Sequence, residues 1–252
     1  MLKQFIDLSF TLLVLIILAN LVGVTAVAAE GKSEKAEIPL IDKREYENVH
    51  EATFALGCFW GVESKYGAVP GVIRTRVGYA GGAKEDPTYH DLGDHTESVQ
   101  LEFNPEVVSY EDLVEIFWES HDPSSRSYST QYANILFYHN DYQQKVAERT
   151  KQEFEEKRDK KVHTQVRPIE EFYPAEPYHQ KYRLKQSSQF IGVLGDIYPD
   201  SEDLRDSTAA ARLNGFLAGH GTPDQVEKLA GKLGLSEAAR GKLLNRFGLK
   251  GG

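Results

Sequence analysis

The chain has 252 residues, 40% of them hydrophobic, and a formal net charge of −9. That length can bury one good core, or a domain of ~150 residues with an appendage. An acidic chain gives no reason to expect nucleic acid or an anionic membrane surface as a partner. The single cysteine, Cys58, excludes an internal disulfide and a cysteine-cluster metal site.

The first 29 residues differ in composition from the rest of the chain. The segment from Leu8 to Ala29 is uncharged, rich in Leu, Ile and Val, and ends in small residues. This pattern is typical of a signal peptide, and the apolar run is also long enough to span a bilayer if it is not cleaved. We therefore interpret residues 1–29 as a signal peptide or an N-terminal membrane anchor, and we expect an exported protein, periplasmic or extracellular. The polar residues 30–48 are predicted to form a solvated linker.

The predicted fold begins after the linker with alternating strands and helices. Residues 52–56 are a short apolar run before a glycine, which is typical of a strand, and residues 58–66 follow as a helix. Apolar and polar residues alternate over 73–79 and again over 99–103, which is the pattern of half-buried strands.

The next part of the chain continues the alternation of strands and helices. Its predicted elements are a helix from Ser109 to Trp118, a strand over 132–138, a helix over 140–157 and a strand over 162–169. Such alternation without long apolar runs predicts an α+β fold. We expect a two-layer sandwich of a mixed sheet with helices, with a ferredoxin-like core, over residues 49–190.

Residues 191–252 are interpreted as a C-terminal helical extension. Thr222 and Gln225 form a capping box that opens one helix, and Ser236 opens another that reaches Phe247. Apolar residues at helical spacing usually pack into a core, so a packing module is the simpler interpretation and partner binding is the alternative.

Cys58 is the first candidate for chemistry. It follows a strand and Gly57 and stands where a helix begins. Free N–H groups and the helix dipole at that end favour negative charge, so we expect the pKa of the thiol to be lowered and the thiolate to act as a nucleophile. The aromatic residues Phe59 and Trp60 are placed to wall an apolar pocket beside the sulfur. A small buried hydrophobic residue is the alternative for a free cysteine.

Three further residues are candidates to converge on Cys58. Glu97 shares its strand face with apolar residues, so we expect an inward carboxyl group with a raised pKa, which suits a general acid. The alternative is a glutamate that reaches solvent at the strand end or pairs with an arginine. Tyr79 is expected to point inward from its strand. Tyr132 is expected to open the strand over 132–138, where a tyrosine in a chain with 13 of them is ordinarily structural.

These residues lie within motifs that occur in a fixed order. The motifs are Gly57 to Gly61 with Glu63, Val77 to Gly82, Pro87 to Tyr89, His95 to Glu97, Phe117-Trp118, His121 to Pro123, Thr130 to Tyr132, Ala175-Glu176 and Tyr178 to Gln180. The ordered set resembles the A-type peptide-methionine (S)-S-oxide reductases over about residues 50–185.

The resemblance implies a role for each candidate. It makes Cys58 the nucleophile that attacks the sulfoxide sulfur, and it makes Phe59 and Trp60 the holders of the terminal methyl group. Glu97 would protonate the sulfoxide oxygen, and Tyr79 and Tyr132 would hydrogen-bond it. Methionine would leave, and the cysteine would become a sulfenic acid that a thiol must reduce.

The chain departs from the family pattern in two places. The loop between Pro123 and Thr130 is short, and Ser127 stands where the family has an aspartate, so Ser127 is the candidate substrate contact there. The C-terminal tail carries no resolving cysteine. We therefore expect no bound cofactor and an external thiol reductant, which would be thioredoxin-like, glutaredoxin-like or a small thiol.

The expected partners are oxidised peptides and proteins and a thiol reductant protein. We expect the enzyme to be a monomer and to repair oxidised proteins. A reductase-like module that binds oxidised methionine or a protein partner with little turnover is the alternative. A cysteine hydrolase lacks a recognisable base. Metal binding by His95 and His121 is not expected, because the chain lacks a second cysteine and the usual ligand spacing.

Overall fold

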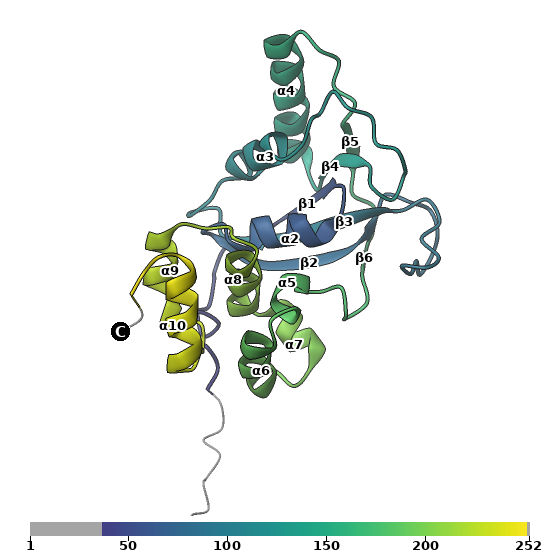
Figure 1. Cartoon of the computed structure of the whole chain (residues 1–252). Helices are drawn as coiled ribbons and strands as arrows, with labels where there is room; N and C mark the ends of the chain where they lie inside the picture. The colour runs from purple at the N-terminus through teal and green to yellow at the C-terminus, as the bar shows by residue number, and fades with distance from the viewer. Residues whose placement is uncertain (1–36, 251–252) are drawn as a thin grey trace, which may run out of the picture. The chain divides into compact units, whose positions relative to one another are not determined.

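The computed structural model describes residues 37–250 (Figure 1). The predicted signal peptide or anchor over residues 1–29 and residues 30–36 of the predicted linker lie outside the described residues. Among residues 37–250, no helix combines the length and the apolar character that crossing a membrane requires.

The described residues form one mixed sheet with helices packed against it. The strands are β1 (His50–Leu56), β2 (Val72–Ala80), β3 (Thr96–Phe103), β4 (Asn134–Tyr138), β5 (Gln165–Pro168) and β6 (Phe172–Pro174). The helices are α2 (Phe59–Gly67), α3 (Tyr110–Glu119), α4 (Asp141–Arg158), α5 (Tyr182–Lys185), α6 (Ser188–Ile197), α7 (Ser201–Asp206), α8 (Thr208–Leu217), α9 (Pro223–Ala230) and α10 (Glu237–Arg246). The strand order is β5-β4-β1-β3-β2-β6.

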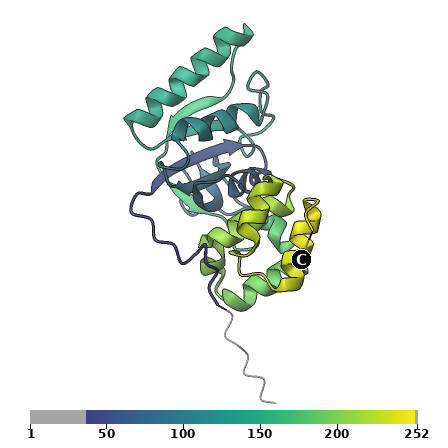
Figure 2. The same cartoon turned by 90° about the vertical axis from the view of Figure 1, so that its left-hand side faces the viewer.

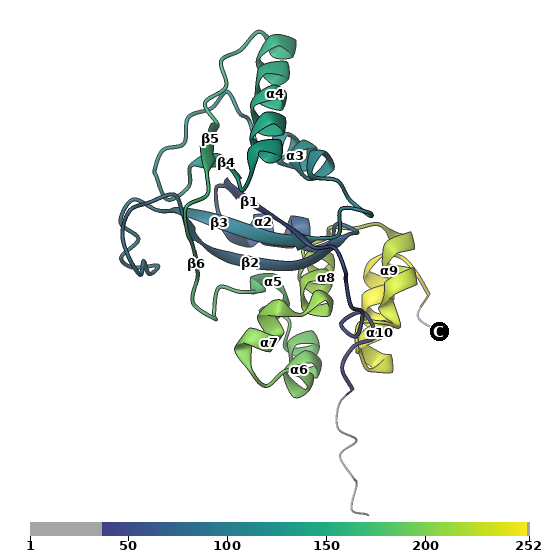
Figure 3. The same ribbon diagram turned by 180° about the vertical axis from the view of Figure 1, so that it is seen from behind.

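The central four strands and two helices form the predicted ferredoxin-like core. Strands β4, β1, β3 and β2 lie side by side as antiparallel neighbours, and helices α2 and α3 are the crossovers. Phe54 of β1 stacks on Tyr66 of α2 with ring centroids 5.0 Å apart, and the Tyr66 hydroxyl donates to the Leu113 carbonyl of α3 at 3.0 Å. Figure 3 shows the sheet from the side opposite α2. The predicted α+β fold class is therefore confirmed.

The edges of the sheet differ from the prediction. The strand predicted over 162–169 is limited to β5, which runs parallel to β4, and β6 pairs with β2 although the sequence predicted no strand there. Both are edge strands of only four and three residues, which is too short for a clear alternation of apolar and polar positions. The strand predicted over 132–138 begins two residues later, at Asn134, and Tyr132 lies in the preceding turn. The Ala133 N–H closes that turn by donating to the Thr130 carbonyl at 3.1 Å, and the Gln131 carbonyl joins the turn to β3 by accepting the Glu97 N–H at 2.9 Å.

The C-terminal helices pack directly on α2 and β2, at the end away from α4 (Figures 1 and 2). Helix α8 lies so close to α2 that a side chain on Gly67 would come within 2.4 Å of the Ala211 carbonyl oxygen. The fully buried Arg212 guanidinium donates to the carbonyls of Gly67 and Val72. The prediction of a domain boundary between residues 190 and 191 remains a prediction.

The described part of the predicted linker is not solvated throughout. Asp42 accepts hydrogen bonds from the Thr208 N–H at 2.6 Å, the Tyr198 hydroxyl at 2.7 Å and the Ser207 hydroxyl at 2.8 Å. A carboxylate at the N-terminus of α8 satisfies free N–H groups and complements the helix dipole. The linker itself remains a prediction, but Asp42 is not solvated as expected, because polar composition does not reveal a partner more than half the chain away.

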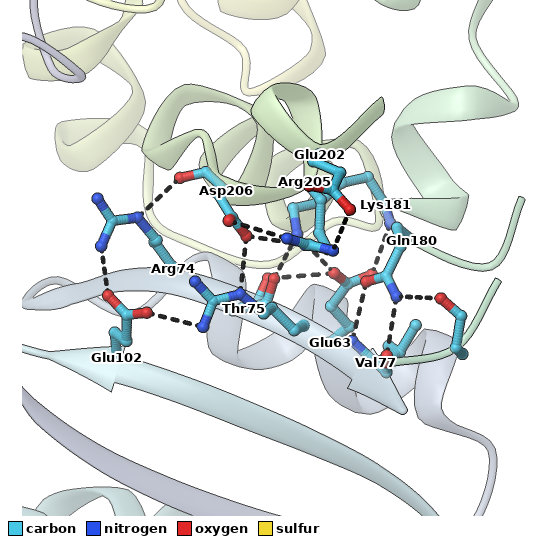
Figure 4. Close-up of polar contacts among 12 residues, drawn as sticks. Glu63, Arg74, Thr75, Val77, Glu102, Gln180, Lys181, Glu202, Arg205 and Asp206 are labelled. Atoms are coloured by element: carbon cyan, nitrogen blue, oxygen red, sulfur yellow. Dashed lines mark hydrogen bonds and ion pairs between the residues drawn. The ribbon is translucent and has the colours of Figure 1, made fainter. Parts of the chain in front are cut away.

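A buried polar network fixes α2 against β2 and the segment before α5 (Figure 4). Glu63 and Lys181 are both fully buried and pair at 2.8 Å, and Glu63 also accepts from the Thr75 hydroxyl and the Lys181 N–H. The Gln180 side chain bonds the N–H and carbonyl of Val77 like an added strand residue. The network therefore anchors the middle of α2, the helix that begins directly after Cys58.

Glu63→Gln is expected to lower the free energy of unfolding by about 3–5 kcal/mol, because it leaves the Lys181 ammonium buried without its counterion. Urea unfolding measures this change. The matched control is Glu153→Gln, which removes a carboxylate from an exposed pair with Arg149 and should cost no more than about 0.5 kcal/mol. Equal effects of the two substitutions would contradict the role of the buried pair.

Candidate active site

Cys58 caps the N-terminus of α2 and makes no side-chain cap hydrogen bond. Gly57 precedes it with φ of 75°, a left-handed conformation that favours glycine and turns the chain from β1 into the helix. The Cys58 side chain is exposed. The local sequence therefore presents the sulfur at the surface, at a helix start, as predicted.

The predicted lowering of the thiol pKa is wrong for the free protein. Burial of the sulfur on its protein side raises the pKa of Cys58, and the Glu97 carboxylate raises it further, whereas the N–H groups of Trp60 and Gly61 lower it. The rise in the thiol pKa from desolvation and a nearby negative charge thus outweighs the lowering of the pKa by the N–H groups at the helix start. The sequence pattern shows the helix end but not the carboxylate that faces it.

Glu97 points inward from the second position of β3, and the residue is only 2% exposed. Its carboxylate accepts from the Phe59 N–H at 3.0 Å and from the Gln131 side-chain amide at 2.8 Å. Neither alternative for Glu97 holds, since the side chain neither reaches solvent nor pairs with an arginine. Burial raises the pKa of Glu97, and the two hydrogen bonds oppose that rise.

Gln131 is a functional residue that the sequence reasoning missed, although it lies beside Tyr132 in the Thr-Gln-Tyr motif. Gln131→Ala should raise the pKa of Glu97 further, because it removes a donor that stabilises the carboxylate. Carbon-13 NMR titration of the Glu97 carboxyl group measures the shift. Gln144→Ala, which removes an exposed donor to Glu148, is the control and should leave that titration unchanged. An unchanged or lowered Glu97 pKa in Gln131→Ala would contradict this assignment.

The two predicted tyrosines have different environments. The fully buried Tyr79 donates its hydroxyl to Glu176 at 2.7 Å, and Glu176 also accepts the Tyr89 N–H at 3.0 Å. Tyr132 is half-buried, and burial, then the charge of Glu97, the neighbouring Tyr89 hydroxyl and finally Cys58 raise its pKa to about 12. Tyr132 therefore faces the same two groups that the sequence singled out, whereas the Tyr79 proton is already shared with Glu176.

The aromatic residues after Cys58 belong to a wider cluster. Trp60 stacks on Tyr182 with ring centroids 3.7 Å apart, and its indole N–H donates to Nδ1 of His179 at 3.2 Å. The half-buried Trp60 is available beside the sulfur, whereas Phe59 is only 1% exposed and packs in the core. No pattern in the sequence pointed to Tyr182, because its partner lies in another helix.

Ser127 lies in the short loop and is exposed. Its hydroxyl donates at 2.8 Å to the carbonyls of Ser129 and Tyr132. Ser127 therefore supports the turn that carries Tyr132, and its predicted contact with substrate remains a prediction.

The two histidines considered as metal ligands are bound to protein groups instead. The His95 ring bonds the Gly82 N–H and the Lys84 carbonyl, and the His121 ring bonds the Phe117 carbonyl and the Thr164 hydroxyl. Within residues 37–250, no group of three or more His, Cys, Asp or Glu side chains is arranged to hold a metal ion.

The chain is similar to known proteins over the same region. A family model described as "Peptide methionine sulfoxide reductase" matches residues 50–205. The peptide methionine sulfoxide reductase of Drosophila melanogaster is 42% identical over 191 residues, which are 75% of this chain and 76% of that protein. Peptide methionine sulfoxide reductase A5 of Oryza sativa subsp. japonica is 40% identical, over 72% of this chain and 73% of that one.

Solved structures agree with the sequence comparisons. The crystal structure of Mxr1 from Saccharomyces cerevisiae in reduced form superposes with a TM-score of 0.52 at 32% identity, over 58% of this chain and 90% of that one. The matched region contains the exposed Cys58 at a helix start and the buried Glu97 beside it. The chain therefore belongs to the peptide methionine sulfoxide reductase family and is an enzyme of that class.

Proposed function

We propose that this enzyme reduces the S epimer of methionine sulfoxide in peptides, proteins and the free amino acid, with Cys58 as nucleophile and Glu97 as proton donor. One observation carries the proposal. The N–H of Phe59, the residue after Cys58, donates to the Glu97 carboxylate at 3.0 Å. A buried carboxyl group with a raised pKa is thereby tied to the start of the nucleophile's helix.

The proposed chemistry follows from these groups. The Cys58 thiolate attacks the sulfoxide sulfur while the protonated Glu97 gives its proton to the oxygen, which is a poor leaving group without it. The hydroxyl moves to the cysteine sulfur, so Cys58 is oxidised to a sulfenic acid, methionine is released and Glu97 is left ionised. Tyr132 faces the oxygen position, and Trp60 supports the substrate methyl group.

An external thiol must complete the cycle, because the chain has no second cysteine. A thioredoxin-like or glutaredoxin-like protein or a small thiol would serve. We also propose that the protein is exported, from the apolar segment and small residues that precede residue 30. Repair of oxidised extracytoplasmic proteins would follow.

The test is reduction of a peptide that carries racemic methionine sulfoxide, with dithiothreitol as reductant. Half of the sulfoxide should disappear, and separation of the products should recover the R epimer intact. A peptide with methionine sulfone, which has no lone pair at sulfur, is the unreactive control. Consumption of the R epimer, or binding of the peptide without any turnover, would contradict the proposal.

A further inference from the structure

A cavity adjoins Cys58 on a side that does not include the groups assigned to the sulfoxide oxygen and methyl group. Its volume is about 290 Å³, and it is lined by Leu56, Cys58, Gly61, Val62, Lys65, Tyr66, Ser120 and His220. It runs along α2 from Cys58 to Lys65. None of Phe59, Trp60 or Glu97 contributes to its wall. The cavity therefore reaches the exposed Cys58 by a route that these three residues do not line.

The C-terminal helices supply His220 to this cavity. His220 lies between α8 and α9, flanked by Gly219 and Gly221 with φ of 89° and 88°. These left-handed glycines turn the chain sharply after α8, and the His220 N–H is held by the Gly215 carbonyl at 3.0 Å. Within the described residues, the His220 ring makes no hydrogen bond to protein. The turn thus presents a free imidazole beside the cysteine.

The cavity has a cationic surrounding. The Lys65 ammonium donates to the Ser120 hydroxyl at 2.9 Å at its edge, and no carboxylate lines the wall. Burial lowers the pKa of His220, and the positive charges of Lys65 and Arg183 lower it further, so the ring is neutral at neutral pH and able to accept a proton. Between residues 37 and 250, neither Lys65 nor Arg183 forms an ion pair.

We infer that this cavity receives a small carboxylate-bearing thiol that reduces Cys58, with His220 accepting the thiol proton and Lys65 attracting the carboxylate. The inference rests on the proposed sulfenic acid at Cys58. The direction of approach supports it. A thiol attacks sulfur in line with the bond that breaks, so displacement of a hydroxyl formed near Glu97 needs a route to the sulfur that Glu97 does not line, and this cavity provides one.

The step balances as follows. The incoming thiol loses its proton to His220, and its sulfur forms a bond with the Cys58 sulfur while the S–O bond breaks. The hydroxide takes a proton from solvent and leaves as water, and His220 returns the thiol proton to solvent, so the step releases one water and leaves the imidazole neutral. The Cys58 sulfur is reduced and the incoming sulfur is oxidised, which gives a mixed disulfide. A second thiol attacks that disulfide, releases the small disulfide and restores Cys58.

The experiment isolates this step from sulfoxide chemistry. One equivalent of hydrogen peroxide converts Cys58 to its sulfenic acid in the full chain, and stopped-flow measurement follows its reduction by thioglycolate, 2-mercaptoethanol or cysteamine. His220→Gln should slow reduction by all three thiols by a factor of about 10 to 10². It should leave the single-turnover yield of methionine from sulfoxide peptide, measured without reductant, unchanged. His50→Gln, at an exposed site on β1, is the matched control.

A second variant tests the charge. Lys65→Gln should slow the reduction of Cys58 by thioglycolate by a factor of about 3 to 10. It should not slow the reduction by cysteamine, because only the anionic thiol loses an attraction. Lys145→Gln, on the exposed surface of α4, should change neither rate. Unchanged thiol rates in His220→Gln, or an equal loss in both half-reactions, would overturn the inference. Absence of methionine formation in the unmodified enzyme would instead overturn the proposed function, while the peroxide route still measures the thiol step.

Discussion

Cys58→Ser is expected to abolish turnover with dithiothreitol, with a loss of at least about 10³-fold in kcat/KM. A serine hydroxyl is not ionised near neutral pH and is a far weaker nucleophile than a thiolate, and the chain has no other thiol that could act in its place. Methionine release from a sulfoxide peptide, quantified by chromatography, is the measurement.

The substitution should leave the fold intact. The Cys58 side chain is exposed and makes no cap hydrogen bond, so the free energy of unfolding should change by less than about 0.5 kcal/mol. The variant should still bind the sulfoxide peptide. Residual turnover above one tenth of the unmodified rate would rule out Cys58 as the nucleophile.

Glu97→Gln is the second large effect, with an expected loss of roughly 10²-fold or more in the rate of the chemical step. Glutamine keeps the size of the side chain and can still occupy the position beside Phe59 and Gln131, but it cannot supply the proton. Single-turnover kinetics without reductant measure this step alone. Glu102→Gln, which alters the other carboxylate of the same strand, on the opposite face where it pairs with Arg74 and Arg76, serves as a control for general effects on β3.

The pH profile separates a proton donor from a merely structural carboxylate. Burial raises the pKa of both Glu97 and Cys58, and the active form needs Glu97 protonated and Cys58 ionised. Above the pKa of Cys58 the thiolate fraction no longer grows while protonated Glu97 keeps declining, so the rate should fall at alkaline pH. In Glu97→Gln that fall should disappear and the rate should reach a plateau. A variant that keeps the alkaline fall would contradict the assignment.

Local patterns in the sequence predicted the core and the position of its two central groups. The alternation around Val99 fixes the parity of β3, so an inward Glu97 follows from the backbone geometry alone. Gly57 before an amphipathic segment likewise places Cys58 at a helix start. The order β4-β1-β3-β2 follows the usual packing of such alternating elements.

Contacts between distant segments could not be predicted in this way. The raised pKa of Cys58 depends on burial and on a carboxylate from another strand. The Tyr79 hydroxyl bonds Glu176, nearly a hundred residues away, and α8 packs on α2 through glycines with no signature of their own. His220 reaches the cavity beside Cys58 only because α8 and its following turn dock there. Such partners are set by tertiary packing, which periodicity does not encode.

The central claim is that one sulfur takes up the oxygen of the sulfoxide. The most direct test is mass spectrometry of the enzyme after reaction with excess sulfoxide peptide in the absence of any reductant, with dimedone added to trap the product. One equivalent of methionine should form per enzyme, and the enzyme peptide containing Cys58 should carry one dimedone group, which marks a sulfenic acid. Methionine formation with Cys58 unmodified, or an adduct on any other residue, would contradict the account.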